Sequence, residues 1–241
     1  ARERIPPLAC TDEPRDPRPA RHGGESTTVS VRLSDEELRA LMRAERASLA
    51  EHLATLTTAQ WRHPSLCGEW EVEHVVAHLA AGASTGQWAW LRSIVLAGLR
   101  PARHNARRLL EHLGATPTET LENFRAVIDS TTTPSKHSIA YLGEVVVHGQ
   151  DIYHPLGITH APPPEAVTAV AGFYARRDFA VDSASVAKGL TLRASDGPFE
   201  AGTGPEVSGP TLALVMALAG RAAFLDQLEG PGVAELARRI G

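Results

Sequence analysis

Four polar residues in one short stretch of the sequence could do chemistry together. Residues 138–153 are mostly apolar, and a polar side chain recurs there at i, i+3, i+7 and i+10: Tyr141, Glu144, His148 and Asp151. Residues at this spacing share one face of an α-helix. Three consecutive valines at 145–147 point in three directions around the axis, so the helix should be buried on most sides. Its polar face must then meet partners, because an unpaired buried carboxylate is costly.

Glu144 and His148 form a Glu-x₃-His pair whose spacing suits two ligands of one metal ion. A divalent cation would balance the carboxylate charge and bind the imidazole nitrogen. The same spacing also suits an ordinary ion pair between residues i and i+4, which is the commoner arrangement on helices. The pair alone therefore favours the ion pair and keeps the metal as an alternative.

A second predicted helix offers a further ligand. His78 stands between apolar neighbours in residues 75–79 and would point into the interior of a helical bundle. A core histidine with a satisfied hydrogen bond is the simpler interpretation. His74, one turn earlier, and His52, on the first predicted helix, are alternative ligands that spacing does not separate from His78. Two histidines and one glutamate would leave coordination positions open, as in catalytic zinc sites, where a metal can polarise a carbonyl or bind a thiolate.

The elements that must position these residues are predicted to form a helical bundle over residues 34–158. Residues 1–33 hold five prolines and no periodic pattern, and are expected to be a disordered tail. A capping box at 34–37 begins the first helix, and 61–70 is expected to be a loop. Four main helices and one shorter helix are expected, over residues 35–59, from 71 into the nineties, over 105–114, from 116 to 128 and over 138–153.

Residues 159–241 are expected to form a small α+β domain. Three prolines at 162–164 open a predicted helix that continues through Phe179 and Val181. Alternating residues at 190–194 and 199–201 flank Asp196-Gly197, which predicts a β-hairpin. An apolar helix is expected from Pro210 to about Gly220, and a last short helix after 230–232. The predicted fold class is therefore mainly α, a four-helix bundle followed by a small α+β domain.

Composition excludes several classes of protein. The chain has 241 residues, of which 43% are hydrophobic and 22% charged, which is typical of a globular protein. The net charge is -4, and the densest basic cluster (Arg103, Arg107 and Arg108) is too small for a recognition surface, so neither nucleic acid nor a membrane is an expected partner. Two cysteines exclude a disulfide scaffold and a Cys₄ metal site, and the cytoplasm is the expected compartment.

Four motifs resemble those of the mycothiol-dependent maleylpyruvate isomerase family, which has a DinB-like metal-binding helical bundle. Residues 70–79, WEVEHVVAHL, resemble its W-x-V-x-D-V-V-A-H-L motif. Residues 64–68 resemble its P-x-x-C-x-G-W loop, and 144–152 its E-x-x-x-H-x-x-D-[LI] helix. Residues 204–221 resemble its C-terminal domain with the [LT]-x-G-R segment. The motifs occur in this order over about residues 36–240.

The resemblance implies a role for several side chains. His78, Glu144 and His148 match the metal ligands, with zinc the expected divalent ion and water in the open positions. Arg221 matches an arginine that reaches toward the substrate, where it would grip a carboxylate; a cation at the end of a helix is an equally good interpretation. Asp151 would orient a ligand or a water molecule, or cap the end of its helix.

Two further positions bear on the site. His74 stands where the family commonly has aspartate, which leaves the three matched ligands intact but alters the charge near them. Cys67 matches a cysteine of the family. It is interpreted as a packed small residue rather than a nucleophile, because no base is predicted beside it.

The resemblance implies an enzyme that depends on a divalent metal and uses mycothiol, a low-molecular-weight thiol, on a small, acidic, electrophilic substrate. The metal would favour the thiolate, which attacks an electrophilic carbon. An isomerase would continue through rotation and elimination, whereas a transferase would stop at the adduct, and the sequence does not separate the two. The alternative is a non-catalytic DinB-like metal-binding or sensor protein.

Overall fold

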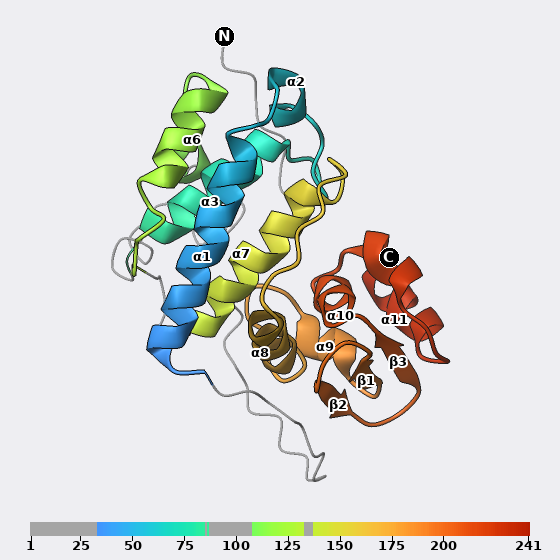
Figure 1. Cartoon of the computed structure of the whole chain (residues 1–241). Coiled ribbons are helices and arrows are strands. Elements are labelled where there is room, and N and C mark those ends of the chain that lie inside the picture. The colour runs from blue at the N-terminus through green and yellow to red at the C-terminus, as the bar shows by residue number, and fades with distance from the viewer. Residues whose placement is uncertain (1–32, 85, 87–107, 133–136) are drawn as a thin grey trace, which may run out of the picture. The chain divides into compact units, whose positions relative to one another are not determined.

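The structure is a computed structural model that describes residues 33–84, 86, 108–132 and 137–241 (Figure 1). The described residues fall into two compact units, 35–161 and 162–241. The expected tail lies outside the described residues except for position 33, and so do Arg103 and Arg107 of the basic cluster. Within the described residues, no helix combines the length and the apolar character needed to cross a membrane.

The longer helices of the first unit, in the part of it that the structure describes, are α1 (Asp35–Leu53), α3 (Val72–Ser84), α6 (Pro117–Arg125) and α7 (Ser138–Tyr153). Helix α7 packs against α1 and α3, and α6 packs against the same two helices (Figure 1). Their buried faces form one apolar core, which includes Leu49, Leu53, Val75, Val76, Leu79, Phe124, Val145 and Ile152. The predicted fold class, a helical bundle followed by a small α+β region, is confirmed.

Two helix ends differ from the prediction. Helix α1 ends at Leu53 rather than near residue 59, because Thr57 starts a separate short helix, α2 (Thr58–Trp61). The Thr57 side chain accepts from the Gln60 amide, and the Gln60 side chain accepts from the Thr57 amide, which is a complete capping box. Helix α3 ends at Ser84, and Gly86 is not helical; residues 85 and 87–107 lie outside the described part of the chain.

Helix α6 begins where the sequence predicts, at Thr116. The Thr116 side chain accepts from the Glu119 amide, and Pro117 takes the first helical position, where its missing N–H costs nothing. The buried Thr120 hydroxyl donates to the Glu73 carboxylate on α3 over 2.8 Å. This bond satisfies a carboxylate that would otherwise be costly to bury, and it fixes α6 beside α3. Residues 108–112 are also helical, which is part of the predicted 105–114 helix.

The second unit combines helices with a three-stranded sheet. Strand β1 (Thr191–Ala194) lies in the middle, antiparallel to β2 (Glu200–Gly202) and parallel to β3 (Glu206–Gly209). The predicted hairpin is confirmed. Strand β3 was not predicted, since it has one apolar residue, Val207, and no alternation to mark it. The other elements are α8 (Pro164–Tyr174), α9 (Ser183–Ala187), α10 (Thr211–Leu218), the 3₁₀ helix η1 (Ala222–Gln227) and α11 (Val233–Ile240).

Helix α8 is shorter than expected. It ends at Tyr174, so Phe179 and Val181 lie beyond it, contrary to the prediction. The Asp178 carboxylate accepts from both the amide and the hydroxyl of Ser185, at 3.0 and 2.6 Å. These bonds tie the segment after α8 to α9 instead of continuing the helix.

Candidate metal centre

The loop between α2 and α3 is fixed by its own hydrogen bonds. The amide and the hydroxyl of Ser65 both donate to the Trp70 carbonyl, at 2.8 and 2.7 Å. The Cys67 amide donates to the Ser65 hydroxyl at 3.0 Å, and the Trp70 amide donates to the Cys67 carbonyl at 3.1 Å. Gly68 allows the tight turn through its positive φ of 57°. These bonds therefore fix the positions of Cys67 and Trp70 relative to each other.

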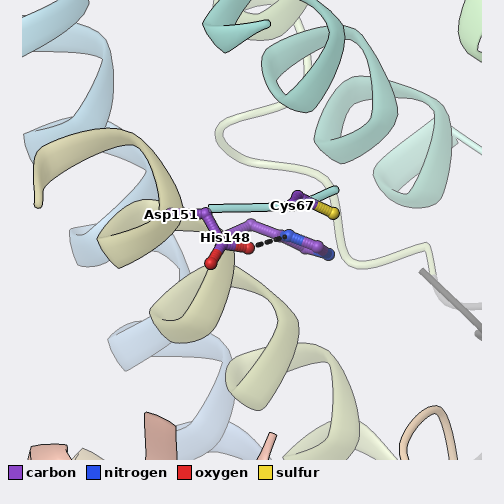
Figure 2. Close-up of side chains that lie close together, drawn as sticks. All are labelled: Cys67, His148 and Asp151. Carbon is purple, nitrogen blue, oxygen red and sulfur yellow. Dashed lines mark hydrogen bonds and ion pairs between the residues drawn. The ribbon is translucent and has the colours of Figure 1, made fainter. Parts of the chain in front are cut away.

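The same loop is attached to the C-terminal part of α7. The Leu66 amide donates to the Asp151 carbonyl at 3.1 Å. This bond brings Cys67 beside His148 and Asp151, although about 80 residues separate them along the chain (Figure 2). Sequence periodicity does not predict a backbone contact of this kind, because it joins a loop to a distant helix.

His148 and Asp151 form a buried hydrogen-bonded pair. The distance from His148 Nδ1 to the Asp151 carboxylate is 2.9 Å, and the two residues are 4% and 0% exposed. An ionised carboxylate can only accept, so Nδ1 carries the proton and the lone pair of Nε2 is left for a ligand. Carboxylates fix metal-binding histidines in this way. The contact is the one expected of Asp151 as an orienting residue.

Among the described residues, the structure gathers one group of three potential ligands. The ligand atoms of Cys67, His148 and Asp151 all lie within 4.8 Å of one another, and all three residues are buried (Figure 2). Of the set predicted from the sequence, only His148 belongs to this group, whereas His78 and Glu144 lie outside it. The structure thus adds Cys67 to the surroundings of His148.

His78 and Glu144 lie along the same interface between α3 and α7. The centroids of the His78 and His148 rings are 5.0 Å apart in an edge-to-face arrangement. The centroid of the Trp70 ring lies 5.1 Å from that of the His78 ring. The Glu144 carboxylate is 3.6 Å from the position a Cβ atom would take on Gly82. His78 faces His148 and Gly82 faces Glu144, so the two helices run antiparallel at this interface and present these residues in matching turns.

The other two histidines have different roles. Nδ1 of His74 accepts from the Glu71 amide at 3.3 Å, at the first turn of α3. Nδ1 of His52 lies 2.8 Å from the Ser48 carbonyl, and its ring contacts Tyr153 and His160. Of the histidines that spacing left open, His78 is the one that the structure places against His148.

A buried arginine provides positive charge near Glu144. Arg46 on α1 is 4% exposed and donates to the Ser130 carbonyl at 2.9 Å, with a longer contact of 3.4 Å to the Val127 carbonyl. Burial lowers the pKa of Arg46, and the negative charge of Glu144 opposes that shift. No role for Arg46 was predicted from the sequence. Its signal was present, because Arg46 lies four residues after Met42 and three before Leu49 on the apolar stripe of α1.

The surroundings of Cys67 differ from the expectation in one respect. The residue is packed and 1% exposed, as predicted, but an imidazole lies beside it where no base was foreseen. Cys10, the other cysteine of the chain, lies outside the described residues.

Arg221 belongs to the second unit. Its guanidinium donates to the Ala219 carbonyl at 2.5 Å, and its amide donates to the Met216 carbonyl at 2.9 Å. The intervening Gly220 has a φ of +84°, which suits the end of a helix. This is the contact expected of a cation at the C-terminus of α10. A grip on a substrate carboxylate stays a prediction.

Comparisons with known proteins agree with the motifs. Residues 42–132, which include the Cys67 loop and α3, match the family model of the mycothiol maleylpyruvate isomerase N-terminal domain. Crystal structures of the mycothiol-dependent maleylpyruvate isomerase and of a histidine-to-alanine variant of it have the same fold, with TM-scores of 0.57 and 0.58. In both comparisons the identity is 18%, over 83% of this chain and 93% of the other. No curated protein sequence matches the chain. The predicted resemblance to the mycothiol-dependent maleylpyruvate isomerase family is therefore confirmed.

Proposed function

We propose that this protein is a divalent-metal-dependent enzyme that uses a low-molecular-weight thiol to isomerise or conjugate a small, acidic electrophile. The observation that carries the proposal is the buried His148–Asp151 pair with the His78 ring 5.0 Å away. Two buried imidazoles, one of them oriented by a carboxylate, are suitable ligands for a metal ion. By the family resemblance, the thiol would be mycothiol and the substrate would be similar to maleylpyruvate.

Three side chains would hold the metal. His148 would bind through Nε2, since Nδ1 is engaged by Asp151, and His78 would bind from the facing helix. Glu144, whose carboxylate lies against Gly82 on the facing helix, would complete the set. Imidazole and carboxylate donors favour zinc, and three protein ligands leave positions open. When bound, such a metal stabilises a thiolate at neutral pH.

Other residues would prepare the site for that chemistry. Arg46 balances the charge of Glu144, and its own bonds to backbone carbonyls keep it in place. Trp70 covers His78 and, with the apolar core beneath, limits access of water. Arg221 would hold a substrate carboxylate through a bidentate contact, after release from the Ala219 carbonyl.

Metal analysis of the purified protein tests the ligand set. We expect stoichiometric divalent metal in the wild type and loss of the metal in His78→Ala, Glu144→Ala and His148→Ala. His74→Ala is the matched control, because this histidine lies on the same helix and bonds the Glu71 amide, and it should retain the metal. Circular dichroism of each variant checks that the bundle is folded. Retention of metal in two of the three ligand variants would overturn the assignment.

A non-catalytic metal-binding protein is the second candidate, favoured by the presence of Cys67 in the buried group. A fourth protein ligand would close the site, as in structural zinc sites. The two candidates differ in whether an external thiol reaches the metal. In the cobalt-substituted wild type, an added thiol should change the sulfur-to-cobalt charge-transfer absorption if the enzyme proposal is correct. A bound cobalt ion without this response favours the non-catalytic candidate.

A further inference from the structure

We propose that the indole N–H of Trp70 donates a hydrogen bond to the thiolate sulfur of the external thiol when that thiol occupies the open coordination position of the metal. This inference rests on the proposed function and deepens it, because it names a residue that would hold the thiol in the site. It assigns to Trp70 a role beyond covering His78.

The indole nitrogen of Trp70 is a buried donor that no described residue engages. Trp70 is 2% exposed, and its Nε1 has no hydrogen-bond partner among the described residues. Buried tryptophan N–H groups usually have an acceptor, because an unsatisfied buried donor costs free energy. An indole N–H donates and cannot accept, so its partner must be an acceptor, and an anion is the strongest one. The side chain therefore suits a ligand that carries negative charge.

The hydrogen bonds of the loop use the backbone of Trp70 and leave its side chain available. The Trp70 amide donates to the Cys67 carbonyl at 3.1 Å, and the Trp70 carbonyl accepts from the amide and the hydroxyl of Ser65, at 2.8 and 2.7 Å. The Leu66 amide attaches the loop to α7 through the Asp151 carbonyl. A loop fixed at these points keeps the indole in place, so its N–H would meet a ligand without rearrangement of the chain.

The Trp70 ring lies against one of the proposed metal ligands. The centroids of the Trp70 and His78 rings are 5.1 Å apart, and the two ring planes are tilted by 51°. A tetrahedral zinc ion binds an imidazole nitrogen at about 2.1 Å and a sulfur at about 2.3 Å, which places the sulfur roughly 3.6 Å from that nitrogen. This separation is shorter than the distance between the two rings. A sulfur that binds the metal beside His78 would therefore lie within reach of the indole.

A thiolate is the anion that the proposed function brings to this position. A hydrogen bond to a charged acceptor is about twice as strong as one between neutral groups, so the indole N–H would favour a bound thiolate over a bound water molecule. Hydrogen bonds to metal-bound sulfur also tune the electronic properties of the sulfur, as they do in iron–sulfur sites. Trp70 would therefore act as a positioning residue that selects the thiol and stabilises its ionised form.

Nuclear magnetic resonance of the full chain tests the hydrogen bond directly. The chain has four tryptophans, and the indole N–H resonance of Trp70 is the one that is lost in Trp70→Phe. If this variant does not fold, phenylalanine variants of the other three tryptophans assign the resonance by elimination. In the zinc-loaded wild type, mercaptoethanol should move the Trp70 resonance downfield, as expected of an N–H that gains an acceptor, whereas ethylene glycol, which has no sulfur, should leave it in place. An unmoved resonance at a thiol concentration that saturates the cobalt spectrum would overturn the inference.

Cobalt spectroscopy separates this inference from the proposed function. Trp70→Phe should bind as much cobalt as the wild type, but the mercaptoethanol concentration that half-saturates its spectrum should be roughly tenfold higher, which is the effect of losing one hydrogen bond to a charged group. Trp61→Phe is the matched control, because Trp61 is a buried core tryptophan on α2, 4% exposed, and it should respond as the wild type does.

The outcomes have distinct meanings. Equal half-saturation in Trp70→Phe and the wild type would contradict the role of Trp70 and leave the proposed function intact. A wild type that binds no cobalt, or whose cobalt spectrum does not respond to the thiol, would instead contradict the proposed function and the inference with it.

Discussion

At the scale of single residues, hydrogen bonds in the candidate site determine which histidine nitrogens stay available for a ligand. Asp151 engages Nδ1 of His148, so Nε2 is the atom that would bind the proposed metal. Glu71 similarly engages His74, which removes that residue from competition with His78. The sequence could place these histidines on helices, and the resemblance could select among them. It could not show that Cys67 lies beside His148, because that contact depends on a loop whose path no periodicity describes.

Gly82 gives the sharpest residue-scale prediction. A Cβ atom there would be 3.6 Å from the Glu144 carboxylate, which is an ordinary contact, so Gly82→Ala should bind metal as the wild type does. Its helix propensity should raise the free energy of unfolding by about 1 kcal/mol. Gly82→Leu would fill the space used by the carboxylate, and we expect its zinc affinity to fall by roughly tenfold or more. Isothermal titration with zinc measures the difference, and equal affinities would contradict the position of Glu144 in the site.

At the scale of elements, the predicted bounds were correct for helices whose start and end are both marked in the sequence. Helix α7 has the predicted bounds, 138–153, and Pro210 and Gly220 bracket α10 as expected. Helix α1 was predicted too long, since its apolar stripe continues past Leu53 and the cap at Thr57 was not recognised. Strand β3 was missed because its place depends on pairing with β1, a contact between segments that is set by the tertiary fold.

The loop that carries Cys67 should affect the site through its hydrogen bonds. Ser65→Ala removes the hydroxyl that donates to the Trp70 carbonyl and accepts from the Cys67 amide. We expect a loss of about 1–2 kcal/mol in the free energy of unfolding, measured by urea denaturation. Ser84→Ala, which removes a single bond to the Ala80 carbonyl within α3, is the control and should lose less. An unchanged stability of Ser65→Ala would show that these hydrogen bonds do not hold the loop.

At the scale of the whole molecule, stability should depend on pH through His112. Burial lowers the pKa of His112, and the charge of Arg108 adds to the effect, while Glu111 opposes it. Above the ordinary histidine pKa of about 6.5 both the folded and the unfolded states are neutral at this residue, so it has no effect there. As the pH falls below 6.5 the unfolded state binds the proton first, and the folded state loses stability.

Urea unfolding across pH 5 to 7.5 measures this contribution. The free energy of unfolding of the wild type should fall as the pH drops below about 6.5, and the fall should be shallower in His112→Gln. The difference between the two proteins, rather than the slope of either alone, reports on His112, because carboxylates elsewhere titrate in the same direction at lower pH. Parallel curves would show that another group is responsible.

The charge balance between Arg46 and Glu144 also has an evolutionary consequence. Arg46 is buried beneath backbone carbonyls, and Glu144 is the carboxylate whose charge acts on it. A descendant that replaced the glutamate would inherit a cation without its counter-charge in the interior of the bundle. Selection for folding alone would then favour loss of the arginine. Relatives that lack the glutamate should therefore lack the arginine as well, and those that keep one should keep the other.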